Sequence, residues 1–104
     1  MKLTEIQIVP VKPKDGLVAF VSFVINDSFF VGDVAIYSRL NQESYRLVYP
    51  IKTLFNGLKI NCFKPINKLV ADEIERQVFA EFEKLIEKAK KTEGIQDDRL
   101  SQIN

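Results

Sequence analysis

The nine-residue run Leu17–Ile25 constrains the fold of this chain more than any other feature, because almost every side chain in it is apolar. Successive side chains of a strand point to opposite faces. One face would carry Leu17, Ala19, Val21, Phe23 and Ile25, and the other would carry Val18, Phe20 and Val24. Both faces therefore need covering, which requires neighbouring strands and a further layer.

Strands are expected on both sides of this run. Residues 2–11 are rich in Ile and Val, and Lys14-Asp15-Gly16 then supplies a turn in which glycine can take a positive φ. Asn26-Asp27-Ser28 ends the central run, and Phe29–Tyr37 resumes it as a third strand. Strict alternation would place Phe30, Val34 and Ile36 on one face of the third strand and Phe29, Val31 and Ala35 on the other.

A second hairpin is predicted after a polar loop. Tyr45–Phe55 and Leu58–Phe63 flank Asn56-Gly57, a pair that strongly favours a type I′ turn with positive φ at both central positions. Pro50 cannot donate a hydrogen bond to a ladder, so it marks a bend or a sheet edge and can split the first of these strands in two.

A long helix is predicted from about Lys68 to Lys91. Asn67 offers a side-chain oxygen to the free amides of the first turn, and Gly94 offers a place to stop. Apolar residues recur three or four positions apart, as on one face of a helix: Ile66, Val70, Ile74, Val78, Phe82, Leu85 and Ala89. We expect residues 1–91 to form a single domain and residues 92–104 to be a frayed tail.

Strands first and one helix last predict an α+β fold, with an antiparallel β-sheet of about five strands followed by one long C-terminal helix. The helix would lie across one face of the sheet and leave the other face open. That open face would carry a contiguous apolar patch that includes Val21, Phe29 and Val31. Such a patch is unusual on a monomer, so we expect a homodimer.

Residues suited to catalysis are scarce. The chain has no histidine, which removes the commonest general base and the usual zinc ligand. Cys62 is the only cysteine and is expected to be buried as a small apolar side chain. Asp33 lies within an apolar strand, where a polar edge or bulge position explains it best. We therefore expect no catalytic residue, no metal site, no cofactor and no small-molecule substrate.

No long uncharged apolar stretch is present, and Glu5 falls where a signal peptide would begin its apolar region. The sequence predicts a cytoplasmic protein that does not act at a membrane.

Basic residues gather in the middle of the chain. Residues 39–68 hold six cations (Arg39, Arg46, Lys52, Lys59, Lys64 and Lys68) against Glu43 alone, which makes this segment +5 in a chain of net charge +1. Aromatic residues interleave with these cations: Tyr45, Tyr49, Phe55 and Phe63. Cations contact phosphates and rings stack on bases, so the pattern is compatible with nucleic-acid binding. It is equally compatible with aromatic core residues and scattered solubilising lysines.

The sequence resembles the stage V sporulation protein G, or septation-regulator, family of small bacterial proteins over most of residues 3–83. The resemblance rests on an ordered series: Leu3-Thr4-Glu5-Ile6, Asp15-Gly16, Ala19, Ser22, Phe30-Val31, Asp33-Val34, Leu47-Val48-Tyr49-Pro50, Lys52, Pro65-Ile66-Asn67, Val78 and Ala80-Glu81-Phe82-Glu83. It implies a β-sheet domain with a C-terminal helix, usually dimeric, that binds DNA and in some members RNA, and that influences septation, sporulation or virulence genes.

The family's nucleic-acid contacts are only partly kept. A Pro-Ser-Lys-Arg stretch of the family becomes Pro50-Ile51-Lys52-Thr53 here, and an arginine of the first helical turn falls on Ala71. The resemblance is thus to a divergent member, in which Lys64 and Lys68 flank the same helical turn.

Two hypotheses follow. The first is a dimeric nucleic-acid-binding regulator that contacts phosphates through Arg46, Lys52, Lys59, Lys64 and Lys68. The second is a non-enzymatic protein-interaction module of septation or sporulation control, in which the apolar sheet face and the acidic helix meet protein partners.

Overall fold

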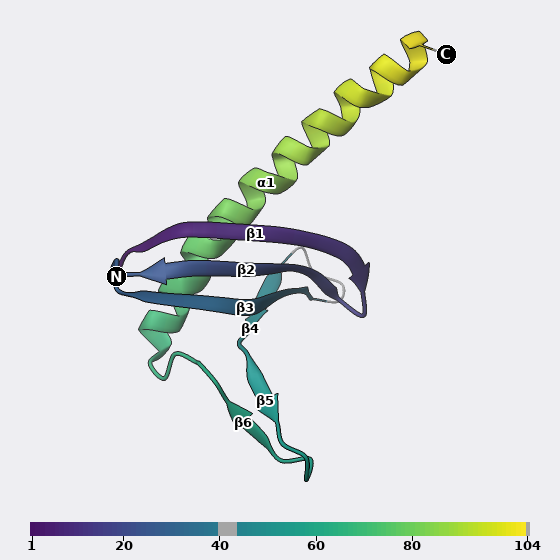
Figure 1. Cartoon of the computed structure of the whole chain (residues 1–104). Helices are drawn as coiled ribbons and strands as arrows, with labels where there is room; N and C mark the ends of the chain where they lie inside the picture. Colours follow the sequence, from purple (N-terminus) through teal and green to yellow (C-terminus); the bar gives the residue numbers. More distant parts are fainter. Residues whose placement is uncertain (40–43, 104) are drawn as a thin grey trace.

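The computed structural model describes residues 1–39 and 44–103, with side chains described as far as Lys90. The strands are β1 (Leu3–Lys14), β2 (Leu17–Ile25), β3 (Phe29–Ser38), β4 (Tyr45–Val48), β5 (Ile51–Thr53) and β6 (Lys59–Asn61), and α1 (Lys68–Ile103) follows them. Strands β1 to β4 form one antiparallel sheet in the order β1-β2-β3-β4, and β5 and β6 form a separate antiparallel pair (Figure 1). The predicted α+β class is confirmed, with six strands in two sheets among the described residues.

Two tight turns connect the first three strands. Asp15 and Gly16 have φ of +54° and +91°, and Asn26 and Asp27 have φ of +48° and +55°. Positive φ at both central residues matches the right-handed twist of the flanking strands, and Asn and Asp tolerate this conformation better than other side chains do. The predicted hairpins are confirmed, including the one that lacks glycine.

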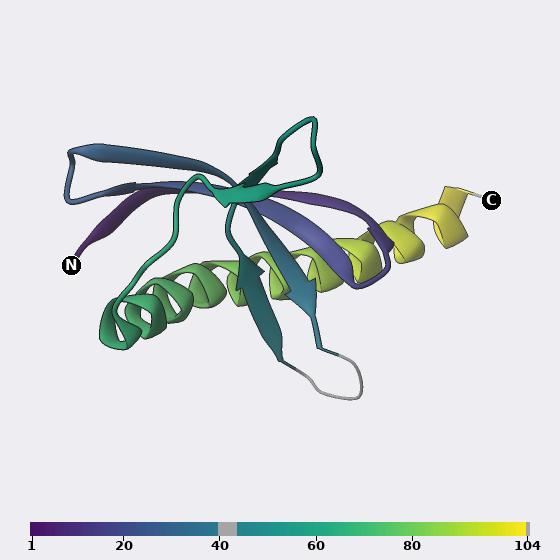
Figure 2. The same ribbon diagram turned by 90° about the horizontal axis from the view of Figure 1, so that it is seen from below.

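One face of the four-stranded sheet is buried against α1, as Figure 2 shows. The helix contributes Ile74, Val78 and Phe82 to this core. The sheet contributes Leu3, Ala19, Val21, Phe23, Val31, Val34, Ile36 and Leu47. The predicted apolar helix face therefore forms the core through its middle, whereas Ile66 remains 93% exposed.

A β-bulge in β3 makes the predicted assignment of its faces wrong. Val21 pairs with Val34 and Phe23 pairs with Val31, so two residues of β3, Gly32 and Asp33, stand opposite a single residue of β2. Asp33 has φ of +59°. Each extra residue shifts the alternation by one position, which turns Val31 into the core on the same side as Val34. The interpretation of Asp33 as a bulge residue is confirmed.

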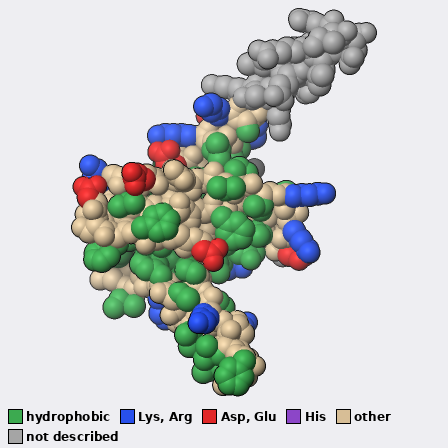
Figure 3. Space-filling view, in the orientation of Figure 1, with side chains coloured by type: hydrophobic (Ala, Val, Ile, Leu, Met, Phe, Trp, Pro, Cys, Tyr) green, Lys and Arg blue, Asp and Glu red, His purple; other side chains and the backbone are tan. Residues whose placement is uncertain are grey.

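The apolar patch on the open face consequently differs from the prediction. Val21 and Val31 are buried in the core beneath α1, at 2% and 4% exposure. The outer face instead exposes Val9 and Phe30, at 61% and 73%, and hydrophobic side chains gather over this side of the sheet in Figure 3.

Pro50 separates β4 from β5 and sends them into different sheets, as the missing amide hydrogen predicts. Among the described residues, β5 and β6 pair only with each other, and they project away from the sheet and the helix (Figure 1). We call residues 51–61 the arm.

Helix α1 begins at the predicted Lys68 and continues to Ile103, so the prediction that Gly94 ends it is wrong. Glycine in a helix costs only about 1 kcal/mol relative to alanine and does not by itself terminate one. Whether residues 92–104 fray stays a prediction. In the described part of the chain, no helix combines the length and the apolar character that crossing a membrane requires.

Candidate nucleic-acid interface

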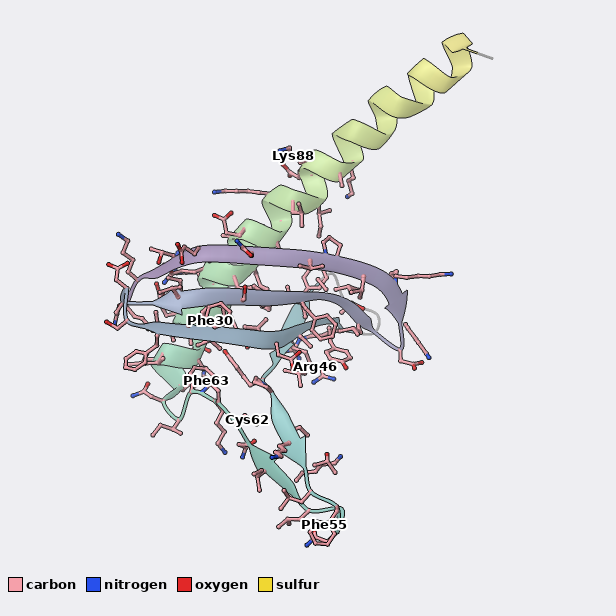
Figure 4. All side chains as sticks on the ribbon, viewed as in Figure 1. Phe30, Arg46, Phe55, Cys62, Phe63 and Lys88 are labelled. Atoms are coloured by element: carbon pink, nitrogen blue, oxygen red, sulfur yellow. The ribbon has the colours of Figure 1, made fainter. Side chains whose placement is uncertain are left out.

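The five candidate cations lie in a section of chain without any carboxylate, since no Asp or Glu occurs between Glu43 and Asp72. All five are exposed. The structure distributes them over three places. Arg46 lies in β4 (Figure 4). Lys52 and Lys59 lie on the arm, Lys64 precedes α1, and Lys68 is its first residue. They form a basic track along one section of chain rather than a single cluster.

The arm is held by a short ladder and a tight turn. Ile51 pairs with Asn61, Lys52 with Ile60 and Thr53 with Lys59. The amide of Gly57 donates to the carbonyl of Leu54 at 2.9 Å, and the amide of Leu54 donates to the carbonyl of Leu58 at 2.8 Å.

The hairpin across Asn56-Gly57 is confirmed, but its predicted type I′ turn is wrong. Of its two central residues only Gly57, at +85°, has a positive φ. The tight turn instead spans Leu54–Gly57 and is followed by pairing of Leu54 with Leu58, which is the pattern of a β-turn with a left-handed glycine after it. Phe55 thereby becomes a central turn residue at the tip of the arm.

Three of the four interleaved aromatic residues are partly buried and pack against the core. The ring of Tyr45 lies edge-on to Phe82 at 4.9 Å between centroids and is tilted against Phe79 at 6.1 Å. The rings of Tyr49 and Phe63 lie 5.7 Å apart. Phe55 differs from all of these because its side chain is fully exposed (Figure 4). The sequence left open whether these aromatic residues belong to the core or are free to stack on bases. Three of them pack against the core, and Phe55 is exposed.

The phenol of Tyr49 is held in its neutral form. Burial, and to a lesser extent the negative charge of Glu75, raises the pKa of Tyr49 from 10.0 to about 12. Among the described residues its hydroxyl has no hydrogen-bond partner. This group therefore supports the base of the arm by packing rather than by charge.

Arg46 lies beside the hairpin of the first two strands. Its guanidinium carbon stands 5.0 Å from the centroid of the Tyr37 ring, a cation–π arrangement. Arg39, which the sequence reasoning left out of the site, lines the same surface depression as Arg46, Tyr37 and Asp15. Arg39 is one of the six cations of residues 39–68, so the positive charge of that segment was the sequence signal for including it in the site.

The start of α1 is capped by the protein itself. The side-chain oxygen of Asn67 accepts hydrogen bonds from the amides of Leu69 at 2.8 Å and Val70 at 3.3 Å, as predicted. Two amides that could have met a phosphate are therefore already satisfied. Lys68 Nζ bonds to Asp72 Oδ2 at 2.9 Å, and this partner raises the pKa of Lys68. Lys64 has no such carboxylate partner among the described residues.

Cys62 is exposed, so the prediction that it is buried is wrong. Its amide donates to the carbonyl of Pro50 at 3.0 Å, at the base of the arm, where no second layer covers it. Within the part of the chain that the structure describes, no group of three or more His, Cys, Asp or Glu residues is placed to hold a metal ion.

The fold and its surface define a small α+β protein with a projecting basic hairpin. The SpoVG family model matches residues 1–84, and the chain belongs to the SpoVG family. Membership in this regulatory family supports a role related to septation or sporulation. None of the curated proteins compared with the chain matches it.

Proposed function

We propose that this protein is a septation- or sporulation-type regulator that acts by binding nucleic acid, with DNA as the first candidate and RNA as the second. The observation that carries the proposal is the basic track itself. Between Glu43 and Asp72 the chain holds Arg46, Lys52, Lys59, Lys64 and Lys68 and no carboxylate, and all five cations are exposed. Among the described residues, the two carboxylates placed next to these cations come from outside the section: Asp72 pairs with Lys68, and Asp15 lines the same depression as Arg46. The excess of positive charge along the track favours the approach of a polyanion.

The cations on the track differ in how freely they can meet a phosphate. Lys68 already pairs with Asp72, and Arg46 lies over Tyr37. Lys52, Lys59 and Lys64 have no carboxylate partner among the described residues. We assign the main phosphate contacts to these three lysines.

Salt dependence tests this proposal directly. For duplex DNA, each phosphate contact contributes about −0.9 to the slope of log affinity against log salt concentration. Three contacts therefore predict a slope near −3. Replacing Lys52 and Lys59 together with Gln should reduce the slope by about two units. The control replaces Lys12 and Lys14, two exposed lysines at the end of β1, and changes net charge equally. Binding to neither DNA nor RNA, or equal effects of the two double variants, would contradict the proposal.

We also propose a homodimer formed through the outer face of the sheet. Helix α1 covers only the opposite face, and Val9 and Phe30 remain largely exposed. A second copy on this face would bury them and would double the number of phosphate contacts. Sedimentation equilibrium at micromolar concentration should give a dimer for the parent chain and a monomer for Phe30→Glu. A monomeric parent chain would contradict the dimer without affecting the phosphate contacts.

A second candidate function is a protein-interaction module of septation or sporulation control. The observation that favours it is the exposed apolar start of α1, where Ile66 and Leu69 are 93% and 79% exposed. Apolar docking to a protein would be far less sensitive to salt than phosphate contacts are. Loss of partner binding in Ile66→Asp, together with a flat salt dependence, would favour this function over the first.

A further inference from the structure

A surface depression at one end of the four-stranded sheet combines charges of both signs. Its volume is about 570 Å³. It is lined by Asp15, Gly16, Tyr37, Ser38, Arg39 and Arg46. Binding sites for small molecules have volumes of about 300–1,000 Å³, so the depression has room for such a molecule.

The depression lies on the face of the sheet that α1 does not cover. Tyr37 and Arg46 are partners in the ladder between β3 and β4. Tyr37 follows the buried Ile36, and Arg46 precedes the buried Leu47, so both side chains leave the sheet on the side opposite the core. Phe30, whose substitution tests the dimer, lies at the other end of β3. The depression is therefore separate from that part of the outer face.

Both arginines of the depression are held by groups that leave their charge available. The guanidinium carbon of Arg46 stands 5.0 Å from the centroid of the Tyr37 ring. Arg39 Nε donates a long hydrogen bond, 3.5 Å, to the carbonyl of Tyr45. A guanidinium presents paired N–H donors that match the two oxygens of a carboxylate or a phosphate. The depression thus offers two places for anionic groups.

Asp15 brings a negative charge to the same depression without neutralising the arginines. It lies in the tight turn between β1 and β2, with φ of +54°. The amide of Ser38 ties this turn to β3, since it donates to the carbonyl of Gly16 at 2.8 Å. Among the described residues, no ion pair joins the Asp15 carboxylate to Arg39 or Arg46. Opposite charges that line one depression and do not pair leave space for a molecule with complementary charges.

We propose that this depression binds a small amino acid with two anionic groups and one ammonium group. Arg39 and Arg46 bind the anionic groups, and Asp15 accepts hydrogen bonds from the ammonium. The second anionic group is a carboxylate, as in L-glutamate, or a phosphate, as in O-phospho-L-serine. The molecule is a ligand and not a substrate. Its binding goes beyond the proposed nucleic-acid function, whose main phosphate contacts are three lysines outside the depression.

Amide chemical shifts of the complete chain locate the binding. Gly16 lines the depression, whereas Gly32 lies at the bulge of β3 and Gly57 lies on the arm. Titration with L-glutamate, and separately with O-phospho-L-serine, at constant ionic strength should shift the Gly16 amide saturably and leave the other two unchanged. The probe that acts at the lower concentration identifies the second anionic group. No saturable shift with either probe, or equal shifts at all three glycines, would overturn the proposal.

Glutarate tests the role of Asp15, because it has the two carboxylates of glutamate and no ammonium. The parent chain should bind L-glutamate about threefold more tightly than glutarate. Asp15→Asn should lose this preference and keep the turn, since asparagine also tolerates positive φ. The matched control is Asp27→Asn, the same change at φ of +55° in the turn between β2 and β3, outside the depression. Equal binding of glutamate and glutarate by the parent chain would overturn the assignment to an amino acid.

Lysine substitutions test the arginines without changing net charge. Arg39→Lys and Arg46→Lys should each bind L-glutamate and glutarate about threefold more weakly, because lysine lacks the paired donors of the guanidinium. Arg76→Lys on α1, outside the depression, should bind both probes as the parent chain does. The amide spectrum of each variant shows directly whether the sheet is still folded. Unchanged affinity in folded Arg39→Lys and Arg46→Lys would overturn the proposed contacts.

Discussion

The side-chain oxygen of Gln77 accepts a hydrogen bond from the backbone amide of Leu3 at 3.1 Å, across 74 positions of sequence. The amide group of the same side chain donates to the carbonyl of Met1 at 3.1 Å and to Glu73 Oε1 at 3.0 Å. One residue of α1 thus fixes the first residues of the edge strand β1 against the helix. The sequence offered no signal for this contact.

Replacing Gln77 with Leu should lower the free energy of unfolding by about 1–2 kcal/mol, because the amide of Leu3 would lose its partner in a partly buried place. Leucine and glutamine have similar helix propensity, so the helix itself is little changed. Urea denaturation measures the difference. The control Arg76→Leu removes only an exposed ion pair with Glu73 and should change stability by less than about 0.5 kcal/mol. Equal effects of the two variants would show that the contact to β1 does not stabilise the fold.

Tyr49 should make the protein sensitive to alkaline pH. Because the folded state raises the pKa of this phenol from 10.0 to about 12, the folded state keeps its proton at a pH where the unfolded chain has lost it. The resulting stability is complete below pH 10 and is lost as the pH rises toward 12.

The variant Tyr49→Phe should therefore lose less stability than the parent chain between pH 10 and pH 12. Near pH 7 it should be at least as stable, because a buried hydroxyl without a partner among the described residues is removed. Chemical denaturation at both pH values provides the measurement. The other tyrosines are common to both proteins and cancel in the comparison. An equal loss of stability in the two proteins between pH 10 and pH 12 would contradict the raised pKa of Tyr49.

Replacing Gly57 with Val should open the arm and leave the core folded. No described atom lies within 4 Å of a Cβ placed at Gly57, so the expected cost comes from its φ of +85°. Such strain costs about 1–3 kcal/mol, which is large for an isolated two-stranded hairpin. Hydrogen exchange should accelerate at the amides of Leu54 and Cys62 and stay slow in β2. The control Leu58→Val adds a β-branched residue to the arm at a position without positive φ. Unchanged protection of the arm amides in Gly57→Val would count against this account.

Lys64→Gln should weaken nucleic-acid binding more than Lys68→Gln, although both remove one charge from the same approach to α1. The ammonium of Lys68 already bonds to Asp72, and a phosphate has to compete with that carboxylate. Asp72→Asn should accordingly strengthen binding. Electrophoretic shift assays at two salt concentrations are sufficient, with Lys84→Gln as a control on the middle of the helix. A larger loss with Lys68→Gln would refute this ranking of the two lysines.

The fold followed from local features of the sequence where those features act alone. Asp15-Gly16 formed its turn because both residues reach positive φ, and Asn67 capped α1 because its side-chain oxygen lies within reach of the following amides. The separation at Pro50 required only the missing amide hydrogen. Gly94 did not mark the end of the helix. The helix propensity that one glycine loses is small beside the summed propensity of the neighbouring residues.

The candidate site was predictable in its charge and not in its shape. The section between Glu43 and Asp72 is free of carboxylates in the sequence itself. Which aromatic residues of this section stay exposed depends on packing partners from distant parts of the chain. Tyr45 is packed because Phe82 lies across from it, and Phe55 is exposed because none of the described elements covers the tip of the arm.

The sequence by itself determined the α+β class, the order of the strands and the helix, and the basic section between them, since periodicity, turn chemistry and charge are properties of adjacent residues. The tertiary structure decided which face of β3 enters the core, which lysines are paired and where Phe55 projects. A bulge at Gly32 and Asp33 depends on how two strands align, and the exposure of a side chain depends on everything packed around it. Strand alignment and side-chain burial depend on interaction energies between residues far apart in the sequence, and a local sequence pattern does not predict these energies.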